Sequence, residues 1–276
     1  HGAFLMERPV RVGAVVYAPQ VVTIWDIIKD FFEENGCPMD YVFYSNYESQ
    51  VQALLRGEID IAWNSPLAWI ESDQWSSGAC RAIAMRDTDR DRVSHILVRA
   101  DSEIETLEDL RGKTIACGAK DSPQATLIPL NLLRRHGLKP GEDVQVRRFD
   151  LLVGKHGDHI GGEQEALECL RRGEADATAL LDLNWQRWSS DGTADPTKFR
   201  VLATTEPFDH CVFTVRNDFP ADEEERWLKV LYSMSYENPA HREMMDLEGL
   251  KEWLPGRTTG FAQLSEAVAH DGLPQA

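Results

Sequence analysis

Two stretches of the chain share one pattern of apolar and polar positions. Residues 50–62 and residues 163–182 each place apolar side chains at helical spacing, then a glycine, then a short apolar run. Gly57 and Gly173 occupy the position just past the helix, where a left-handed residue often ends it. Each stretch therefore predicts a helix, a glycine stop and a buried strand.

The two copies are separated by far more residues than a solenoid period, which favours one copy in each of two similar lobes. Both predicted strands run into polar or aromatic residues, including Asn64 in the first copy and Asp182 in the second. In open α/β sheets, ligands bind beyond the carboxyl ends of the strands. We therefore expect two lobes that enclose a ligand cleft. The alternative is that Arg-Gly-Glu is simply a common helix-to-strand turn.

The remaining pattern alternates short apolar runs with amphipathic stretches and predicts an α/β fold of two open mixed sheets flanked by helices. We expect the first lobe to comprise residues 1–99 and 206–276 and the second residues 100–205. Thr23 is a candidate N-cap for the first helix. Further strands are predicted at 10–16, 41–44, 82–85, 93–98, 114–117, 144–149 and 201–204, and helices at 24–32, 106–112, 123–135, 226–236 and 239–247, before a mixed tail.

Composition narrows the range of functions. The chain has 276 residues, with 42% hydrophobic and 27% charged residues, which is ordinary for a soluble protein with two modest cores. No apolar run approaches the length of a membrane span. The net charge of −17 argues against nucleic acid as a partner, because no basic stripe is available for phosphates.

The five cysteines are odd in number and form no close pair, which is typical of a reduced chain rather than a disulfide framework. Met6, followed at once by a charged residue and a predicted strand, is a possible native start, which predicts a cytoplasmic protein. Equally, a leader could have been removed, which predicts a periplasmic or extracytoplasmic one.

A glycine-led loop at residues 118–126 opens the helix predicted at 123–135. Asp121 or Ser122 is well placed as its N-cap, and Pro123 suits the first turn. A helix N-terminus at this point would offer N–H groups to an anion or a carboxylate. Plain capping without a ligand is the alternative.

Several of these motifs together resemble the PhnD-like phosphonate and phosphate substrate-binding proteins of ABC transporters, within the type II periplasmic binding protein superfamily. The likeness covers nearly the whole chain and rests on Gly-Glu-Ile-Asp-Ile-Ala-Trp at 57–63, Leu-Glu-Asp-Leu-Arg-Gly-Lys at 107–113 and Gly-Glu-Ala-Asp-Ala at 173–177. The resemblance implies a hinged two-lobed protein that closes on a small polar or anionic ligand and delivers it to a permease.

The resemblance also implies ligand contacts. The loop and helix N-terminus would supply donors, the first lobe would add an aromatic and polar set, and Asp182 would bind an amine or hydroxyl. The expected contacts are Tyr47, Asn64, Ser65, Ser122, Gln124, Ala125, Thr126 and Asp182, with Glu163 as a second acidic position. Two sites depart from the family pattern. Asn64 stands where an aromatic residue is common, and Ser122-Pro123-Gln124 keeps at most one hydroxyl of the family's run.

A histidine-rich loop suggests a second hypothesis, a cytoplasmic enzyme on the same fold. His156, His159 and Glu163 have borderline spacing for a Zn or Fe site. His210 and Cys211 could add a metal ligand, a nucleophile or a general acid–base group. No cofactor is firmly implied, and no catalytic motif of the menaquinone-pathway enzymes or thiamin pyrimidine synthases that share the fold is present. Solvated loop histidines are the alternative.

Overall fold

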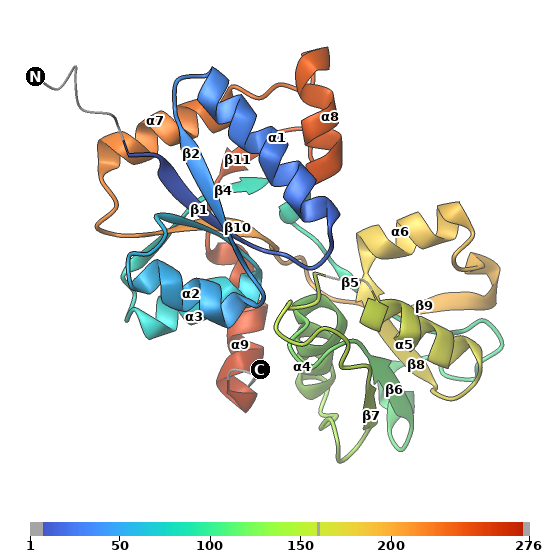
Figure 1. Ribbon diagram of the computed structural model, residues 1–276. Coiled ribbons are helices and arrows are strands. Elements are labelled where there is room, and N and C mark those ends of the chain that lie inside the picture. The colour runs from blue at the N-terminus through green and yellow to red at the C-terminus, as the bar shows by residue number, and fades with distance from the viewer. Residues whose placement is uncertain (1–7, 159–160, 273–276) are drawn as a thin grey trace, which may run out of the picture. The chain divides into compact units, whose positions relative to one another are not determined.

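The computed structural model describes residues 8–158 and 161–272, and its contacts divide the chain into two compact units (Figure 1). Unit 1 comprises His1–Arg90 and His210–Thr259, and unit 2 comprises Asp91–Asp209 and Gly260–Ala276. Each unit is built on one mixed sheet with helices on both faces. The predicted α/β class with two sheets is confirmed.

The sheet of unit 1 has six strands in the order β11-β4-β10-β3-β1-β2. Strand β1 is parallel to β2 and β3, whereas β10 is antiparallel to both β3 and β4. The strands are β1 (Val10–Val15), β2 (Met39–Tyr44), β3 (Ile61–Asn64), β4 (Cys80–Arg86), β10 (Val212–Arg216) and β11 (Trp253–Pro255).

Helices cover both faces of this sheet. On one face, α1 (Gln20–Glu34), α7 (Ala221–Tyr232) and α8 (Pro239–Glu248) bury a shared core, in which Phe32 stacks on Trp227. The other face is covered by α2 (Tyr47–Leu55) and α3 (Pro66–Trp75), whose apolar residues pack against the end of β1. A short 3₁₀ turn, η2 (Asp87–Asp89), follows β4.

The sheet of unit 2 has five strands in the order β7-β6-β8-β5-β9. Strand β6 is parallel to β7 and β8, and β5 is antiparallel to β8 and β9. The strands are β5 (Ser94–Arg99), β6 (Thr114–Cys117), β7 (Gln145–Arg148), β8 (Ala177–Leu181) and β9 (Phe199–Thr204).

Unit 2 also has helices on both faces. Its first core joins β6 and β8 to the turn η3 (Leu107–Leu110) and to α4 (Ile128–Arg135), which follows the π-helical turn η4 (Pro123–Leu127). Its other cores involve α5 (Gly161–Arg171) and α6 (Asp182–Asp191). The short turns η5 (Pro196–Lys198) and η6 (Thr259–Phe261) precede β9 and α9 (Ala262–Asp271), and α9 packs against α4.

The repeated sequence pattern gives the same local structure in both units. Gly57 and Gly173 have φ of 78° and 79°. In each copy the residue after the glycine donates its N–H back across the helix end, from Glu58 to the Ala53 carbonyl at 2.9 Å and from Glu174 to the Cys169 carbonyl at 3.0 Å. The strands that follow, β3 and β8, pair in parallel with β1 and β6, respectively.

Several local expectations differ from the structure, including the helix expected at 226–236, which is α7 at Ala221–Tyr232. Helix α1 begins at Gln20 with Pro19 as its N-cap, so Thr23 lies inside the helix. The helix expected at 123–135 begins as a π-helical turn. Helix α6 includes Asp182, expected as a strand end. The mixed tail contains β11 and α9.

The division by contacts differs from the expected lobe boundaries in two places. Strand β5 belongs to the second sheet, so unit 2 starts at Asp91 rather than at residue 100. Helix α9 belongs to unit 2 because it packs on α4, whereas residues 206–276 were all expected in the first lobe.

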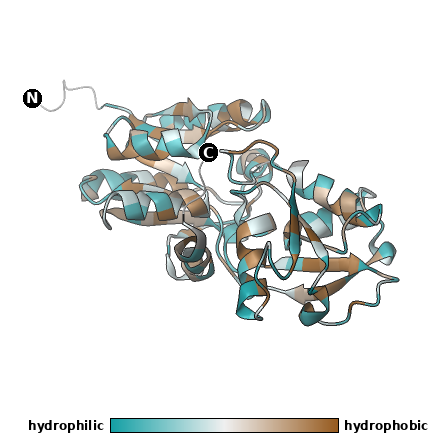
Figure 2. Cartoon of the chain, turned by 90° about the horizontal axis from the view of Figure 1, so that it is seen from below, coloured by the Kyte–Doolittle hydropathy of each residue, from teal (hydrophilic) through white to brown (hydrophobic). Residues whose placement is uncertain are grey.

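Hydropathy colouring in Figure 2 shows helices that carry both hydrophobic and hydrophilic segments, as expected when one side of each helix packs on a sheet. Within residues 8–158 and 161–272, no helix combines the length and apolarity needed to cross a bilayer.

Candidate functional site

In unit 1, Asn64 ends β3 as a fully buried residue in a polar chain. Its side-chain oxygen accepts a hydrogen bond from Gln50 Nε2 at 3.0 Å, and its Nδ2 donates to Ser72 Oγ at 3.2 Å. Gln50 Nε2 also donates to the Trp63 carbonyl at 2.8 Å. Asn64 therefore joins β3 to both α2 and α3. Gln50 was missed from sequence, since a glutamine on an apolar helix face has no motif.

Ser65 and Tyr47 begin the two helices beside Asn64. Ser65 is the N-cap of α3, and its Oγ accepts the Ala68 N–H at 3.0 Å. Tyr47 is the first residue of α2 and packs in a small cluster with Val51 and Ala68. Unit 1 thus gathers the three predicted residues in one region, and each has a structural role there.

In unit 2, the π-helical turn η4 holds the other predicted contacts. Ser122 is the N-cap, as predicted, and its Oγ accepts the Ala125 N–H at 3.2 Å. The Ser122 carbonyl accepts the N–H groups of both Thr126 and Leu127, at 3.2 and 3.0 Å. The N–H groups of Ala125, Thr126 and Leu127 are therefore bonded inside the turn. The side-chain amide of Gln124 is bonded as well, so the side-chain donors that remain are the hydroxyl hydrogens of Ser122 and Thr126.

Glu163, in α5, is hydrogen-bonded to this turn. It is 2% exposed, and its carboxylate accepts hydrogen bonds from Gln124 Nε2 at 2.9 Å, Asn184 Nδ2 at 2.8 Å and the Leu181 N–H at 3.2 Å. Burial raises the pKa of the Glu163 carboxyl, although the three donors act in the opposite direction. Gln124 also donates to the Gly157 carbonyl at 3.0 Å. Glu163 and Gln124 therefore connect η4, α5 and α6.

Two buried polar atoms beside Ser122 have no hydrogen-bond partner among the described residues, namely Asp121 Oδ1 and Thr126 Oγ1. Both residues are 2% exposed. The other carboxylate oxygen of Asp121 accepts the Gly154 N–H at 2.6 Å. The sequence suggested Asp121 only as a helix cap, a role that Ser122 fills instead.

Asp182 is the first residue of α6, where a carboxylate suits the helix dipole. Its Oδ2 lies 3.7 Å from Arg92 Nη2, and its Oδ1 has no hydrogen-bond partner within the described part of the chain. Burial lowers the pKa of nearby His95, while the charge of Asp182 opposes that shift.

The proposed metal ligands differ in their surroundings. His156 is fully buried and has a positive φ of 51°. Its ring and the carboxylate of Asp121 have donor atoms within 4.8 Å of each other. His159 lies outside the described residues. Because both oxygens of Glu163 already accept hydrogen bonds, Glu163 is poorly placed as a metal ligand.

A second group in unit 1 joins Asp89, His210 and Cys211. His210 Nδ1 lies 3.1 Å from Cys211 Sγ and 3.8 Å from Asp89 Oδ1. Both neighbours face the same ring nitrogen, whereas a nucleophile–histidine–carboxylate relay uses the two ring nitrogens separately. Arg86 binds Asp89 through Nε at 2.7 Å and Nη2 at 2.9 Å. These residues offer donor atoms for a metal.

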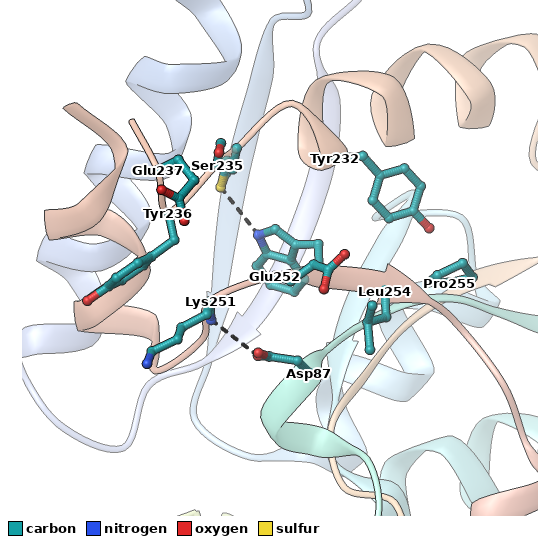
Figure 3. A pocket seen from close by; sticks show the side chains of 11 residues that line it. Asp87, Tyr232, Ser235, Tyr236, Glu237, Lys251, Glu252, Leu254 and Pro255 are labelled. Carbon is teal, nitrogen blue, oxygen red and sulfur yellow. Dashed lines mark hydrogen bonds between the residues drawn. The ribbon is translucent and has the colours of Figure 1, made fainter. Parts of the chain in front are cut away.

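A pocket of about 610 Å³ lies in unit 1 between the segment after α7 and β11. Figure 3 shows Tyr232 and Tyr236 on opposite sides of it, with Glu252 between them. The Lys251 N–H donates to Asp87 Oδ1 at 3.2 Å at its edge. None of the predicted ligand contacts lines this pocket.

The comparisons with known proteins agree with this fold. A profile of the ABC transporter phosphonate periplasmic substrate-binding protein family matches residues 16–259. The probable phosphite-binding protein PhnD1 of Prochlorococcus marinus is 20% identical over 248 residues, which cover 86% of this chain and 80% of that protein.

Solved structures show the same fold. PhnD1 of P. marinus in complex with methylphosphonate superposes with a TM-score of 0.73 at 16% identity, covering 96% of this chain and 98% of that one. XAC2383 of Xanthomonas citri bound to ATP gives 0.72 at 19% identity, covering 96% and 99%. The aliphatic sulphonate-binding protein SsuA of Escherichia coli gives 0.59 at 17% identity, covering 95% and 79%. With the profile covering most of the chain, this protein belongs to the family of periplasmic substrate-binding proteins of phosphonate ABC transporters.

Proposed function

We propose that this protein binds a small phosphonate-like oxyanion and delivers it to the permease of an ABC transporter. The observation that carries the proposal is the family profile, which spans residues 16–259. The complex of PhnD1 with methylphosphonate, a structure of the same fold, supports this ligand class. The sulphonate-binding protein SsuA, at lower structural similarity, indicates sulphonates as a competing ligand class.

Within unit 2, we assign the oxyanion to the hydroxyl groups of Ser122 and Thr126, because their hydrogens are the side-chain donors left at η4. Gln124 and Ala125 would support the site indirectly, since the side-chain amide of Gln124 and the N–H of Ala125 already donate hydrogen bonds within unit 2. Asp182 would accept a donor group of the ligand. In unit 1, Tyr47, Asn64 and Ser65 remain the predicted contacts.

Thermal unfolding with candidate ligands tests the proposal. A ligand that binds only the folded protein raises Tm, because it adds about 2.7 kcal/mol to the free energy of unfolding at 100 times its Kd. We expect methylphosphonate, phosphite or phosphate to raise Tm in a concentration-dependent way, and calorimetric titration to give one site per chain. If none of these oxyanions shifts Tm or releases heat, the proposed ligand class is wrong.

The family places such proteins outside the cytoplasm. We propose that a leader directs this chain there, and N-terminal sequencing of the mature protein from fractionated cells tests that step. A start at Met6 in the native protein would contradict it. The comparisons support the binding protein rather than the enzyme on the same fold. The metal hypothesis for His156, His159 and Glu163, with His210 or Cys211 as a further ligand, stays a prediction, which metal analysis of the purified protein decides.

A further inference from the structure

Strand β2 forms one end of the unit 1 sheet, and its outer edge is open. The Val16 N–H, just past β1, donates to the Tyr44 carbonyl of β2 at 3.0 Å. Backbone groups of successive residues alternate between the two sides of a strand, so even-numbered residues of β2 bond to β1 and odd-numbered residues point away. Tyr41 and Phe43 therefore direct their N–H and C=O groups outward. Across residues 8–158 and 161–272, neither backbone bonds to a further segment.

The other three sheet ends carry features that usually prevent a foreign strand from adding. Strand β11 has only three residues, one of them Pro255, and β7 has only four, with Arg147 and Arg148 among them. Strand β9 pairs with β5 through a register shift between Ile96 and Leu97. By contrast, β2 has six residues in unbroken register with β1 and no proline within it. The β2 edge is therefore the one of the four that suits a partner strand.

The side chains beside this edge are aromatic and acidic on one face. The rings of Tyr41 and Phe43 stack with centroids 4.6 Å apart, and both residues are partly exposed. Helix α1 packs on β2 (Figure 1), and the exposed Asp26 accepts the Tyr41 hydroxyl. That hydrogen bond raises the pKa of Tyr41, and the charge of the exposed Asp30 acts in the same direction, whereas Lys29 opposes them. The α1 side of the edge therefore attracts positive charge.

We infer that the β2 edge binds an extended segment of another protein in which basic and apolar residues alternate. The segment adds to the sheet as a strand and exchanges backbone hydrogen bonds with Tyr41 and Phe43. On the α1 side, its Lys or Arg stems lie along the two aromatic rings, with their charges beside the acidic residues of α1. On the other side, its apolar residues continue the face that contains Val42. A second copy of this chain fits less well, because two chains of net charge −17 repel each other.

Fluorescence anisotropy tests the inference with a labelled peptide of about seven residues in which lysine and valine alternate. We expect saturable binding to the wild-type protein that weakens as salt is added. A second peptide has the same residues in two blocks, lysines first and valines after. It carries the same charge but cannot present one kind of side chain to each face, so it should bind about tenfold more weakly. If the alternating peptide does not bind, or the two peptides bind equally, the inference is wrong.

Phe43→Pro tests the backbone pairing, because it removes an outward N–H at a position where an edge strand tolerates proline. It should weaken binding of the alternating peptide about tenfold relative to the matched control Phe43→Val, which also loses the ring but keeps the N–H. Circular dichroism verifies the fold of both variants. If they bind alike, no strand is added at this edge. If Phe43→Pro does not fold, the comparison of the two peptides on the wild type decides.

Asp30→Asn tests the charge of the partner. It should weaken binding and reduce its salt dependence, whereas Asp222→Asn, which removes an exposed acid of α7, should leave both unchanged. Equal effects of the two variants would show attraction by net charge alone and contradict the inference. Light scattering should give a monomer. A dimer that Phe43→Pro dissociates would mean that a second copy occupies the edge instead.

Discussion

At the scale of single residues, three carboxylates of unit 2 differ in burial and in hydrogen bonding, although all three are acidic residues in the sequence. Glu163 is a buried carboxylate with three donors, so it holds η4, α5 and α6 together. Asp121 is equally buried but keeps one oxygen without a partner among the described residues. Asp182 is partly exposed and pairs with Arg92. The two buried carboxylates therefore differ in how many of their oxygens are hydrogen-bonded within the described residues.

The raised pKa of Glu163 predicts a specific pH dependence of stability. Between the ordinary value of 4.5 and its raised value in the folded protein, Glu163 binds more protons in the folded than in the unfolded state. Its contribution to the free energy of unfolding therefore falls as pH rises through that window. Glu163→Gln, which cannot ionise, should become more stable relative to the wild type over the same range.

Urea unfolding at a series of pH values above 4 measures this difference. Glu165→Gln, at an exposed position of the same helix, is the control, because it measures the general effect on stability of losing one carboxylate. Glu163→Ala should lose about 2–4 kcal/mol at every pH, because it leaves the donors from Gln124 and Asn184 unpaired in the interior. A Glu163→Gln difference that does not change with pH would contradict the assigned pKa shift.

The five cysteines predict slow thiol chemistry in the folded protein. All five are buried thiols, and burial raises the pKa of Cys117 to about 12. Burial also raises the pKa of Cys80 and Cys169. Because the thiolate is the reactive form, Ellman's reagent should label none of them quickly in the native state. The guanidinium-unfolded protein should give five thiols per chain, and a rapidly labelled native thiol would contradict the burial described.

At the scale of elements, the position of η4 depends on a close approach between β6 and the turn. Gly118 follows β6, and a Cβ added there would lie 2.9 Å from the Ala125 Cβ. The backbone of Gly118 also donates to the Ala125 carbonyl at 3.4 Å. A glycine at 118 and a small residue at 125 therefore set how deeply the turn sits, and with it the Ser122 and Thr126 hydroxyls.

Gly118→Ala should destabilise the protein by about 1–3 kcal/mol and weaken oxyanion binding, because the added methyl displaces the turn. The double variant Gly118→Ala/Ala125→Gly removes the overlap. It should recover the loss apart from about 1 kcal/mol for a glycine in a helical turn. Urea unfolding and calorimetry of the single and double variants give the coupling energy. If the stability losses of the Gly118→Ala and Ala125→Gly variants add in the double variant, the two positions are not sterically coupled.

At the scale of the whole molecule, the chain passes between the two units three times, after Arg90, Asp209 and Thr259. The last passage assigns α9 to unit 2, where Glu266 Oε2 accepts hydrogen bonds from Asn131 Nδ2 and Arg135 Nε, both at 2.8 Å. The C-terminal helix of the described chain therefore completes the unit that the middle of the sequence builds, which sequence order alone does not suggest.

Leu264→Ala tests this assignment. Leu264 is 1% exposed in α9, so removing its side chain should cost about 2–5 kcal/mol. Hydrogen exchange should then accelerate in α4, while α7 of unit 1 keeps its protection. The matched variant Leu231→Ala, also 1% exposed but in α7, should do the reverse. Faster exchange of α7 in Leu264→Ala would place α9 with unit 1, as residues 206–276 were expected.

Local patterns in the sequence determined most strands and helices, the two copies of the helix–glycine–strand motif, and the cap at Ser122. These features depend on residues a few positions apart, such as Gly57 and Gly173 in the left-handed conformation. The helix over 123–135 was predicted, but its π-helical first turn was not, because a turn of five residues is too short for its periodicity to be distinguished from that of an α-helix.

Only the tertiary structure decided which polar groups form hydrogen bonds within the protein and which do not. Asp121 and Gly154 are 33 residues apart, and Gln124 and Glu163 are 39 apart, so no local pattern pairs them. The metal candidate Glu163 was assigned from spacing within its loop, yet its oxygens are bonded by side chains from other elements. Hydrogen bonds between distant segments form only when the sheet brings the strand ends together, and a linear sequence does not contain that geometry.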